Sequence, residues 1–352
     1  MRVAIVGFPY AGKSTLFRAI SGVPADHLKL AEENLAAVKV PEPRLDFLEK
    51  LYSPKKRTET TINFVDLPGG TDGEDQGGFQ RHLPALRQSD ALLFVVREFE
   101  SPNVPTPAGG LDPAKELSQL RDELLIADFV ICDNRIEKLE AAIKKPTPDR
   151  DKNKHELEVL TRCRAALEDG TPLRQVIQPG DEEKMLRSFG FLTQKPGVVT
   201  INVSEERVSA APAFEDEFAN ATLNVCAEIE AEIMSLDEAD RPEFMESYGI
   251  DALARDRVIR ASFDALGMIC FLTAGEPEVR AWPIPRDSTA VDAAGSIHSD
   301  LARGFIRAET IAFADLLAAG SKRDAKAAGK VRLEPKNYIV QDGDVLDIRF
   351  NV

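Results

Sequence analysis

A lysine and a serine follow a glycine close to the start of the chain, in the order that phosphate-binding loops use. The stretch Gly7-Phe-Pro-Tyr-Ala-Gly-Lys13-Ser14 matches the pattern G-x-x-x-x-G-K-S/T. Glycines let backbone N–H groups turn toward a phosphate, the lysine neutralises the β and γ oxygens, and the serine hydroxyl is offered to Mg²⁺. We expect Lys13 to be the catalytic residue of a nucleoside-triphosphate site. The predicted nucleotide contacts in this loop are Gly7, Tyr10, Ala11, Gly12, Lys13, Ser14 and Thr15.

A carboxylate suited to the metal follows the next apolar stretch. Residues 60–65 predict a second strand, and Asp66-Leu-Pro-Gly69 then matches D-x-x-G. The carboxylate at the strand tip holds Mg²⁺, usually through water, and the Gly69 amide senses a γ-phosphate. Alone this motif is weak, because a plain turn explains it, but after a phosphate-binding loop it is a strong indication. We predict Ser14 and Asp66 as metal ligands and Gly69 as a nucleotide contact.

A third segment has the spacing of a base-recognition motif. Residues 197–206 predict a strand that ends in Asn202-Val-Ser-Glu. GTPases of this architecture have N-K-x-D here, and the Asp accepts two hydrogen bonds from guanine. Val203 replaces the Lys and Glu205 the Asp, so adenine becomes the better fit, with GTP as the alternative. We predict base contacts from Asn202, Val203 and Glu205, and from Cys226 and Ala227 after the following strand.

The elements around these motifs predict an α/β fold. Residues 2–6 are an apolar, β-branched strand that leads into the glycine loop, and "STLFRAI" follows at helical spacing. Strand, loop and helix in this order are the context that the motif requires. The fold expected is a P-loop nucleotide-binding domain with a Rossmann-like, mostly parallel sheet. Charged, repeating patterns on both sides of the polar turn "KPTPDRDKNK" predict an antiparallel helical pair.

Composition limits the setting and the partners. The 352 residues include no stretch near the ~20 apolar residues of a membrane span, no signal-peptide pattern and no Cys-x-x-Cys pair. We therefore expect a cytoplasmic protein without a membrane partner. The net charge of −15 opposes non-specific binding to nucleic acid. Residues 322–336, however, hold six basic residues against two acidic ones; they are either a solvated helix face or a local patch that contacts RNA.

With these motifs the chain resembles the YchF group, the Obg-like ATPases of the translation-factor P-loop class. Besides the motifs above, the resemblance rests on the stretches "VPEPRLDFLEKL", "VREFE", "LDPAKELSQLRDELLIAD", "CAEIEAEI", "LTAGEPEVRAWPIP", "AAGSIHSDLARGFIRAETI" and "YIVQDGDVLDIRFNV". It implies a nucleotide domain at 1–125 plus 172–267, an inserted helical hairpin at 126–171, and a C-terminal β-grasp (TGS) domain at 268–352. It also implies association with the ribosome or its large subunit.

The chain departs from this group at four positions, and we expect these differences to slow nucleotide hydrolysis. Tyr10 replaces an Asn that in related GTPases helps to hold a monovalent cation. Leu30 replaces a Thr of switch I, Gly70 follows D-x-x-G, and Thr106 stands where the group often has a His. Catalysis in this class is positioning plus electrostatics, so such losses reduce rate more than affinity. We expect slow ATP hydrolysis; the alternatives are a true GTPase and a hydrolysis-deficient module that acts through its TGS domain.

Overall fold

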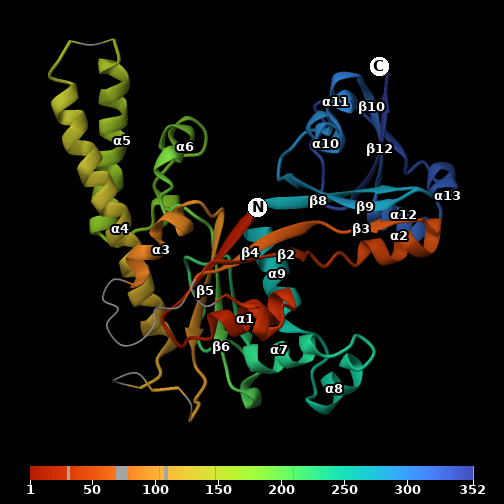
Figure 1. Cartoon of the computed structure of the whole chain (residues 1–352). Helices are drawn as coiled ribbons and strands as arrows, with labels where there is room; N and C mark the ends of the chain where they lie inside the picture. The colour runs from red at the N-terminus through yellow and green to blue at the C-terminus, as the bar shows by residue number, and fades with distance from the viewer. Residues whose placement is uncertain are drawn as a thin grey trace. The chain divides into compact units, whose positions relative to one another are not determined.

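The computed structural model describes residues 1–29, 32–68, 78–102, 104–106, 110–146, 148–208 and 210–351 (Figure 1). Contacts within the chain divide it into two units. The first unit comprises Met1–Ala37 and Asn63–Ala265, and the second comprises Val38–Ile62 and Leu266–Val352.

A largely parallel sheet forms the centre of the first unit. Its strands lie in the order β2 (Asn34–Lys39), β4 (Thr61–Asp66), β1 (Arg2–Val6), β5 (Ala91–Arg97), β6 (Gly197–Asn202) and β7 (Ala221–Val225). β1 pairs in parallel with β4 and β5, and β6 lies in parallel between β5 and β7. The predicted strands that end at Asp66 and Asn202 are confirmed. Because the strands are parallel, both residues lie at the carboxyl edge of the sheet.

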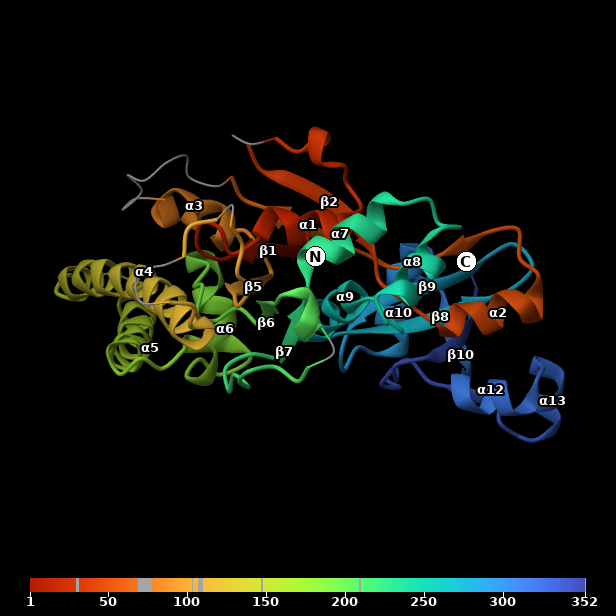
Figure 2. The same ribbon diagram turned by 90° about the horizontal axis from the view of Figure 1, so that it is seen from below.

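Helices cover both faces of this sheet, which explains why its inner strands β1, β5 and β6 are almost entirely buried. Alternate residues such as Ala4 and Val6 pack with Leu117, Leu120 and Leu124 of α4 (Pro113–Ala142). α9 (Ala254–Ala265) packs against β6 and β7, and α1 (Lys13–Ser21) packs against α7 (Ala227–Ser235) (Figure 2). The unit is completed by α3 (Gly78–Arg87), α6 (Asp181–Leu186), α8 (Arg241–Ser247) and one-turn 3₁₀ helices at Ala25–His27, Leu173–Gln175, Arg187–Phe189 and Glu205–Arg207.

The two long helices α4 and α5 (Arg150–Glu168) lie side by side (Figure 1). Asp112 caps α4 by accepting a hydrogen bond from the Lys115 amide at 3.0 Å, with Pro113 as the first helical residue. Farther along, apolar side chains of both helices form one buried cluster. The guanidinium of Arg135 binds both carboxylate oxygens of Glu156, at 2.7 and 2.8 Å. The expected helical pair is therefore present.

A mixed sheet forms the second unit. Its strands lie in the order β11 (Arg332–Glu334), β10 (Phe305–Ala312), β12 (Asp344–Phe350), β8 (Met268–Ala274), β9 (Val279–Pro285) and β3 (Arg57–Thr58). β10 pairs antiparallel with β11 and β12, whereas β12 pairs in parallel with β8. The helices of the unit are α2 (Arg44–Tyr52), α10 (Ala290–Ile297), α11 (Ser299–Arg303), α12 (Phe313–Ala319) and α13 (Lys322–Ala327).

Two boundaries differ from those expected. The contacts of residues 38–62 group them with the C-terminal unit, although the resemblance placed them in the nucleotide domain. The reason is that β3 pairs with β9 and that the Arg44 guanidinium binds the Asp342 carboxylate at 2.7 Å. α4 begins at Pro113, before the expected start of the hairpin at residue 126. Within the described ranges, no helix is long and apolar enough to cross a membrane.

Candidate functional site

The glycine loop connects the end of β1 to the start of α1, and neighbouring atoms leave no room for side chains at its two glycines. A Cβ at Gly7 would lie 2.5 Å from the carbonyl oxygen of Val95 in β5. Gly12 has a φ of +93°, and a Cβ there would lie 2.1 Å from the side-chain nitrogen of Asn202. Glycine is therefore required at both positions for the loop to approach β5 and β6 this closely.

Lys13 begins α1, and its ammonium group faces two carboxylates. The Lys13 Nζ donates a hydrogen bond to the carbonyl oxygen of Phe8 at 2.9 Å. Burial lowers the pKa of this ammonium group, whereas the charges of Asp66 and Glu116 raise it. The lysine thus lies where negative charge gathers at the carboxyl edge of the sheet. Asp66 was predicted here, and Glu116 was not.

Asp66 is the last residue of β4, and its side chain is only partly satisfied. The residue is 2% exposed, and its Oδ1 is buried without a hydrogen-bond partner among the described residues. Burial raises the pKa of the Asp66 carboxyl, whereas Ser14, Lys13 and Asn34 lower it. A buried carboxylate oxygen without a partner needs a compensating group, and a bound cation is such a group. Beside a serine hydroxyl it offers the oxygen ligands that Mg²⁺ prefers, so Ser14 and Asp66 fit the expected metal.

Asn202, at the end of β6, connects the glycine loop to the loop before α7. Its Nδ2 donates to the carbonyl oxygen of Ala11 at 3.0 Å, and its Oδ1 accepts from the amide of Ala227 at 3.1 Å. The residue is 6% exposed, so both hydrogen bonds are shielded from water. The structure therefore gives Asn202 a clear positioning role between the two predicted parts of the nucleotide site.

A cavity of about 820 Å³ opens beside these loops. The predicted site residues that line it are Tyr10, Gly12, Thr15, Asn202, Val203, Glu205 and Cys226. Phe99 and Tyr248 contribute aromatic rings to the same lining. Its volume lies within the range of ~300–1,000 Å³ that is typical of ligand sites. The cavity therefore brings together the phosphate loop and the segment that was predicted to contact the base.

Tyr10 has an unusual backbone conformation for its residue type. Its φ is +67° and its side chain is 56% exposed. Non-glycine residues rarely adopt this region, and Asn does so more readily than Tyr. Tyr10, which replaces the Asn of the group that the chain resembles, therefore also has a strained backbone conformation. Its side chain borders both the large cavity and a neighbouring one of about 440 Å³.

Arg97 is a site residue that the sequence analysis did not single out. It ends β5, is 3% exposed, and its backbone amide donates to Glu116 Oε2 at 2.9 Å. Its guanidinium donates to the carbonyl oxygens of Phe99 and Pro105, at 3.0 and 2.8 Å. Arg97 therefore holds the loop after β5 against the start of α4. The sequence feature that could have identified Arg97 is a charged residue at the end of an otherwise apolar strand.

Some expected residues have no structural account. Gly69, Leu30 and Gly70 lie outside the described residues. Thr106 is described, is exposed, and lines the smaller cavity together with Arg97 and Glu116. Among the residues that are described, no group of three or more His, Cys, Asp or Glu side chains is arranged to hold a metal. A metal held by one carboxylate and one hydroxyl is compatible with that result.

The phosphate loop, the partly buried lysine and the aspartate at the carboxyl edge of a parallel sheet define a P-loop nucleotide-binding protein. Comparisons with known proteins are more specific. A family model described as "50S ribosome-binding GTPase" matches residues 2–134. The model YchF-GTPase_C, described as "Protein of unknown function (DUF933)", matches residues 268–351.

Full-length relatives give the family. The "Ribosome-binding ATPase YchF" of Bacillus subtilis (strain 168) is 39% identical, and the alignment covers 100% of both chains. The protein of the same name from Escherichia coli O157:H7 is 38% identical over 100% of this chain and 99% of the relative. The solved structure of the Schizosaccharomyces pombe YchF GTPase superposes with a TM-score of 0.83 at 26% identity, covering 99% and 97% of the two chains. The chain belongs to the YchF family, as the motifs indicated.

Proposed function

We propose that this chain binds ATP in preference to GTP, hydrolyses it slowly, and uses its nucleotide state to control association with the ribosome. The observation that carries the proposal is the cavity beside the glycine loop, which Val203 and Glu205 line in place of a guanine-reading Lys and Asp. The two bacterial relatives compared above are both named ribosome-binding ATPases, which supports the same activity.

The base preference follows from side-chain chemistry. An Asp at the position of Glu205 would accept two hydrogen bonds from guanine, and the longer Glu does not fit that arrangement. Val203 is 1% exposed and lacks the long aliphatic stem with which a Lys covers the ring. A site whose polar groups stay unpaired against the wrong ligand rejects it strongly. GTP is the alternative substrate, because the S. pombe relative is described as a GTPase.

For the metal, we propose that the Ser14 hydroxyl and Asp66 Oδ1 hold Mg²⁺. When bound, Mg²⁺ neutralises negative charge on the β- and γ-phosphates. Lys13 neutralises further charge on the same oxygens, and backbone N–H groups of the loop from Gly7 to Thr15 orient the phosphates. Gly69, outside the described residues, is proposed to contact the γ-phosphate.

Phosphate release from ATP tests hydrolysis. The wild-type protein with Mg²⁺ should release phosphate near the ~10⁻³ s⁻¹ scale of unassisted small GTPases. Lys13→Ala is the control, because it removes the ammonium group without enlarging any side chain. Release by the wild type that is no faster than release by Lys13→Ala would instead favour a nucleotide-binding module without hydrolysis.

The proposed ribosome contact lies in the second unit. It includes fewer residues than the six basic side chains of residues 322–336, because some of these are already paired with carboxylates. Lys322 binds Asp347 and Glu309, at 2.9 and 3.1 Å, so its charge is compensated. Two further basic side chains of the stretch are paired, Lys330 with Asp315 and Arg332 with Glu334. Arg323, Lys326 and Lys336 have no ion-pair partner in the part of the chain that the structure describes. Of these three, Arg323 and Lys326 lie together on α13. We propose that these two contact RNA phosphates, in the cytoplasm, where ribosomes are.

Co-sedimentation with ribosomes tests this contact. Arg323→Glu with Lys326→Glu should weaken binding and flatten its salt dependence, since each phosphate contact contributes about 0.9 to the logarithmic salt slope for a duplex. Lys322 stays unchanged, because reversing it would disrupt its own ion pairs. The matched variant is Lys144→Glu with Lys145→Glu at the tip of the helical pair. Loss of sedimentation only in that second variant would move the contact to the helical pair.

A further inference from the structure

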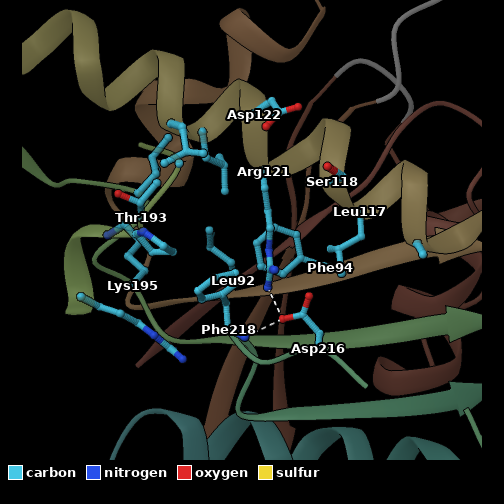
Figure 3. A pocket seen from close by; sticks show the side chains of 18 of the residues that line it. Leu92, Phe94, Leu117, Ser118, Arg121, Asp122, Thr193, Lys195, Asp216 and Phe218 are labelled. Atoms are coloured by element: carbon cyan, nitrogen blue, oxygen red, sulfur yellow. Dashed lines mark hydrogen bonds and ion pairs between the residues drawn. The ribbon is translucent and has the colours of Figure 1, made fainter. Parts of the chain in front are cut away.

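A further cavity of about 290 Å³, which we call the second cavity to distinguish it from the nucleotide cavity, lies on the face of the first unit's sheet that α4 covers (Figure 3). Leu92 and Phe94 near the start of β5 and Gly197 at the start of β6 line it, as does Phe218 from the segment before β7. It therefore opens near the amino ends of the strands, whereas the nucleotide cavity lies at their carboxyl ends. None of the residues that line the nucleotide cavity lines this one.

The apolar wall of this second cavity depends on a glycine. A Cβ at Gly197 would lie 2.8 Å from the ring of Phe94, so any larger residue would push that ring out of position. Leu92 and Phe94 are 1% and 6% exposed, and Phe214 and Phe218 add aromatic rings from the loop before β7. Ligand sites are typically apolar surfaces of this kind with a few polar groups at fixed positions.

Two arginines supply the polar groups. Arg121 extends from α4 across the cavity to Asp216, which it binds by one nitrogen, and its guanidinium carbon lies 4.9 Å from the centre of the Phe218 ring (Figure 3). The same Asp216 oxygen also accepts the Phe218 amide at 2.8 Å. A guanidinium has five N–H donors, so most of those of Arg121 remain available to a ligand.

Arg174 also lines the cavity, and its guanidinium group has no direct ion pair with a described carboxylate. Its Nη1 donates to the side-chain oxygen of Asn220 at 3.1 Å, a neutral acceptor. No carboxylate of the described residues lies within ion-pair distance of it. Burial lowers the pKa of Arg174 and the charge of Arg121 lowers it further, whereas the charge of Asp216, which is bound to Arg121, raises it.

The other charged side chains that line the cavity are Lys195 and Asp122, and neither forms an ion pair with Arg174. Lys195 also lines the cavity, but its Nζ donates to the carbonyl oxygens of Arg87 and Ser89. Asp122 lines it and is exposed, so water solvates its carboxylate. The cavity lining therefore has three positive and two negative side chains, and Arg174 is the guanidinium group that hydrogen-bonds only a neutral side chain.

We propose that this second cavity binds a small amphipathic carboxylate, whose apolar body lies against Phe94 and Phe218 and whose carboxylate binds Arg121 and Arg174. Guanidinium groups present parallel N–H donors that match the two oxygens of a carboxylate. The volume of about 290 Å³ is just below the ~300–1,000 Å³ range of ligand sites, which indicates a molecule much smaller than a nucleotide. Medium-chain fatty acids and aryl-alkanoic acids share this chemistry.

Calorimetry on the full-length protein without nucleotide tests the proposal, with octanoate and 3-phenylpropionate as probes. One of the two acids should bind saturably with one molecule per chain, and the tighter of them identifies the apolar body. The alcohol of the same carbon skeleton should bind at least tenfold more weakly. No saturable binding of either acid, or equal binding of the acid and its alcohol, would overturn the proposal.

Variants locate the binding in the cavity. Arg174→Gln should weaken the bound acid at least tenfold, whereas Arg187→Gln, at an exposed arginine that does not line the cavity, should leave it unchanged. Ser118 lines the cavity from an exposed position of α4, so Ser118→Phe should fill it and abolish binding without unfolding the protein, and Ser118→Ala should bind normally. Unchanged binding in both Arg174→Gln and Ser118→Phe, with melting temperatures equal to the wild type, would refute the site.

Discussion

Replacing Asn202 by Ala should separate the two halves of the nucleotide site. The wild-type side chain joins the Ala11 carbonyl to the Ala227 amide through two buried hydrogen bonds. The substitution leaves both backbone groups without that partner, at about 1–3 kcal/mol each. We expect a loss of unfolding free energy near the lower end, about 2–3 kcal/mol in total, because Asn202 lines the cavity of about 820 Å³ and its removal opens a path for water to both groups.

Nucleotide affinity is the more specific readout of this variant. The two hydrogen bonds hold the phosphate loop and the base-side loop in one arrangement before the nucleotide binds, so without them binding must order both loops. At about 1.4 kcal/mol for each factor of ten, the loss of even one such interaction weakens ATP binding roughly tenfold. The assay is equilibrium titration of ATP with Mg²⁺, alongside urea denaturation of the same preparations.

Asn224→Ala is the matched control. Asn224 lies on the neighbouring strand β7, is 3% exposed, and donates to the carbonyl oxygens of Ala210 and Ala211 at 3.1 and 3.3 Å. It thus resembles Asn202 in burial and in bonding two backbone groups, but it does not touch the phosphate loop. Its loss should destabilise the fold without a comparable loss of ATP affinity. Equal weakening of ATP binding by both variants, or none by Asn202→Ala, would refute the positioning role.

Three further predictions concern the metal, the rate and pH. Ser14 and Asp66 should be the protein's only contacts to Mg²⁺, so Asp66→Asn should raise the Mg²⁺ concentration needed for ATP binding at least tenfold, because interactions with a charged group contribute about 1.5–3 kcal/mol; an unchanged Mg²⁺ titration, or a switch I side chain on the metal in a nucleotide-bound crystal structure, would contradict this. Potassium should not accelerate ATP hydrolysis over sodium, because Tyr10 has no amide oxygen to hold the ion, and a clear potassium dependence would show that reasoning to be wrong. Burial raises the pKa of Glu230 to about 7 from its ordinary 4.5; the folded protein therefore retains a proton that the unfolded chain releases, and stability should fall as pH rises across that interval. Glu230→Gln should remove this slope in urea denaturation measured at several pH values, and an identical slope would count against it.

The phosphate loop, Asp66 and Asn202 were predictable because each follows a strand in a short pattern. Local sequence specifies both the strand and the residue that ends it, and parallel pairing then brings the strand ends together. Glu116 follows no such pattern, and Arg97 ends an apolar strand but belongs to no recognisable motif. Their contact with each other depends on where α4 begins against the end of β5, and that is a tertiary arrangement.

The second cavity was inaccessible to sequence analysis for the same reason. Arg121, Arg174 and Asp216 come from three segments, and Arg121 and Asp216 are 95 positions apart. Each looks like an ordinary surface charge in the sequence. The placement of residues 38–62 was missed because their apolar pattern shows that α2 packs, but not against which partner.

The relative affinity of the wild-type protein for ATP and GTP, measured by equilibrium competition for one site in the presence of Mg²⁺, tests the central claim most directly. The account predicts that ATP binds at least tenfold more tightly, because guanine leaves polar groups unpaired in a site that Val203 and Glu205 line, at about 1–3 kcal/mol for each such group. Val203→Lys with Glu205→Asp should then shift the preference toward GTP. Equal or tighter binding of GTP by the wild-type protein would contradict the account.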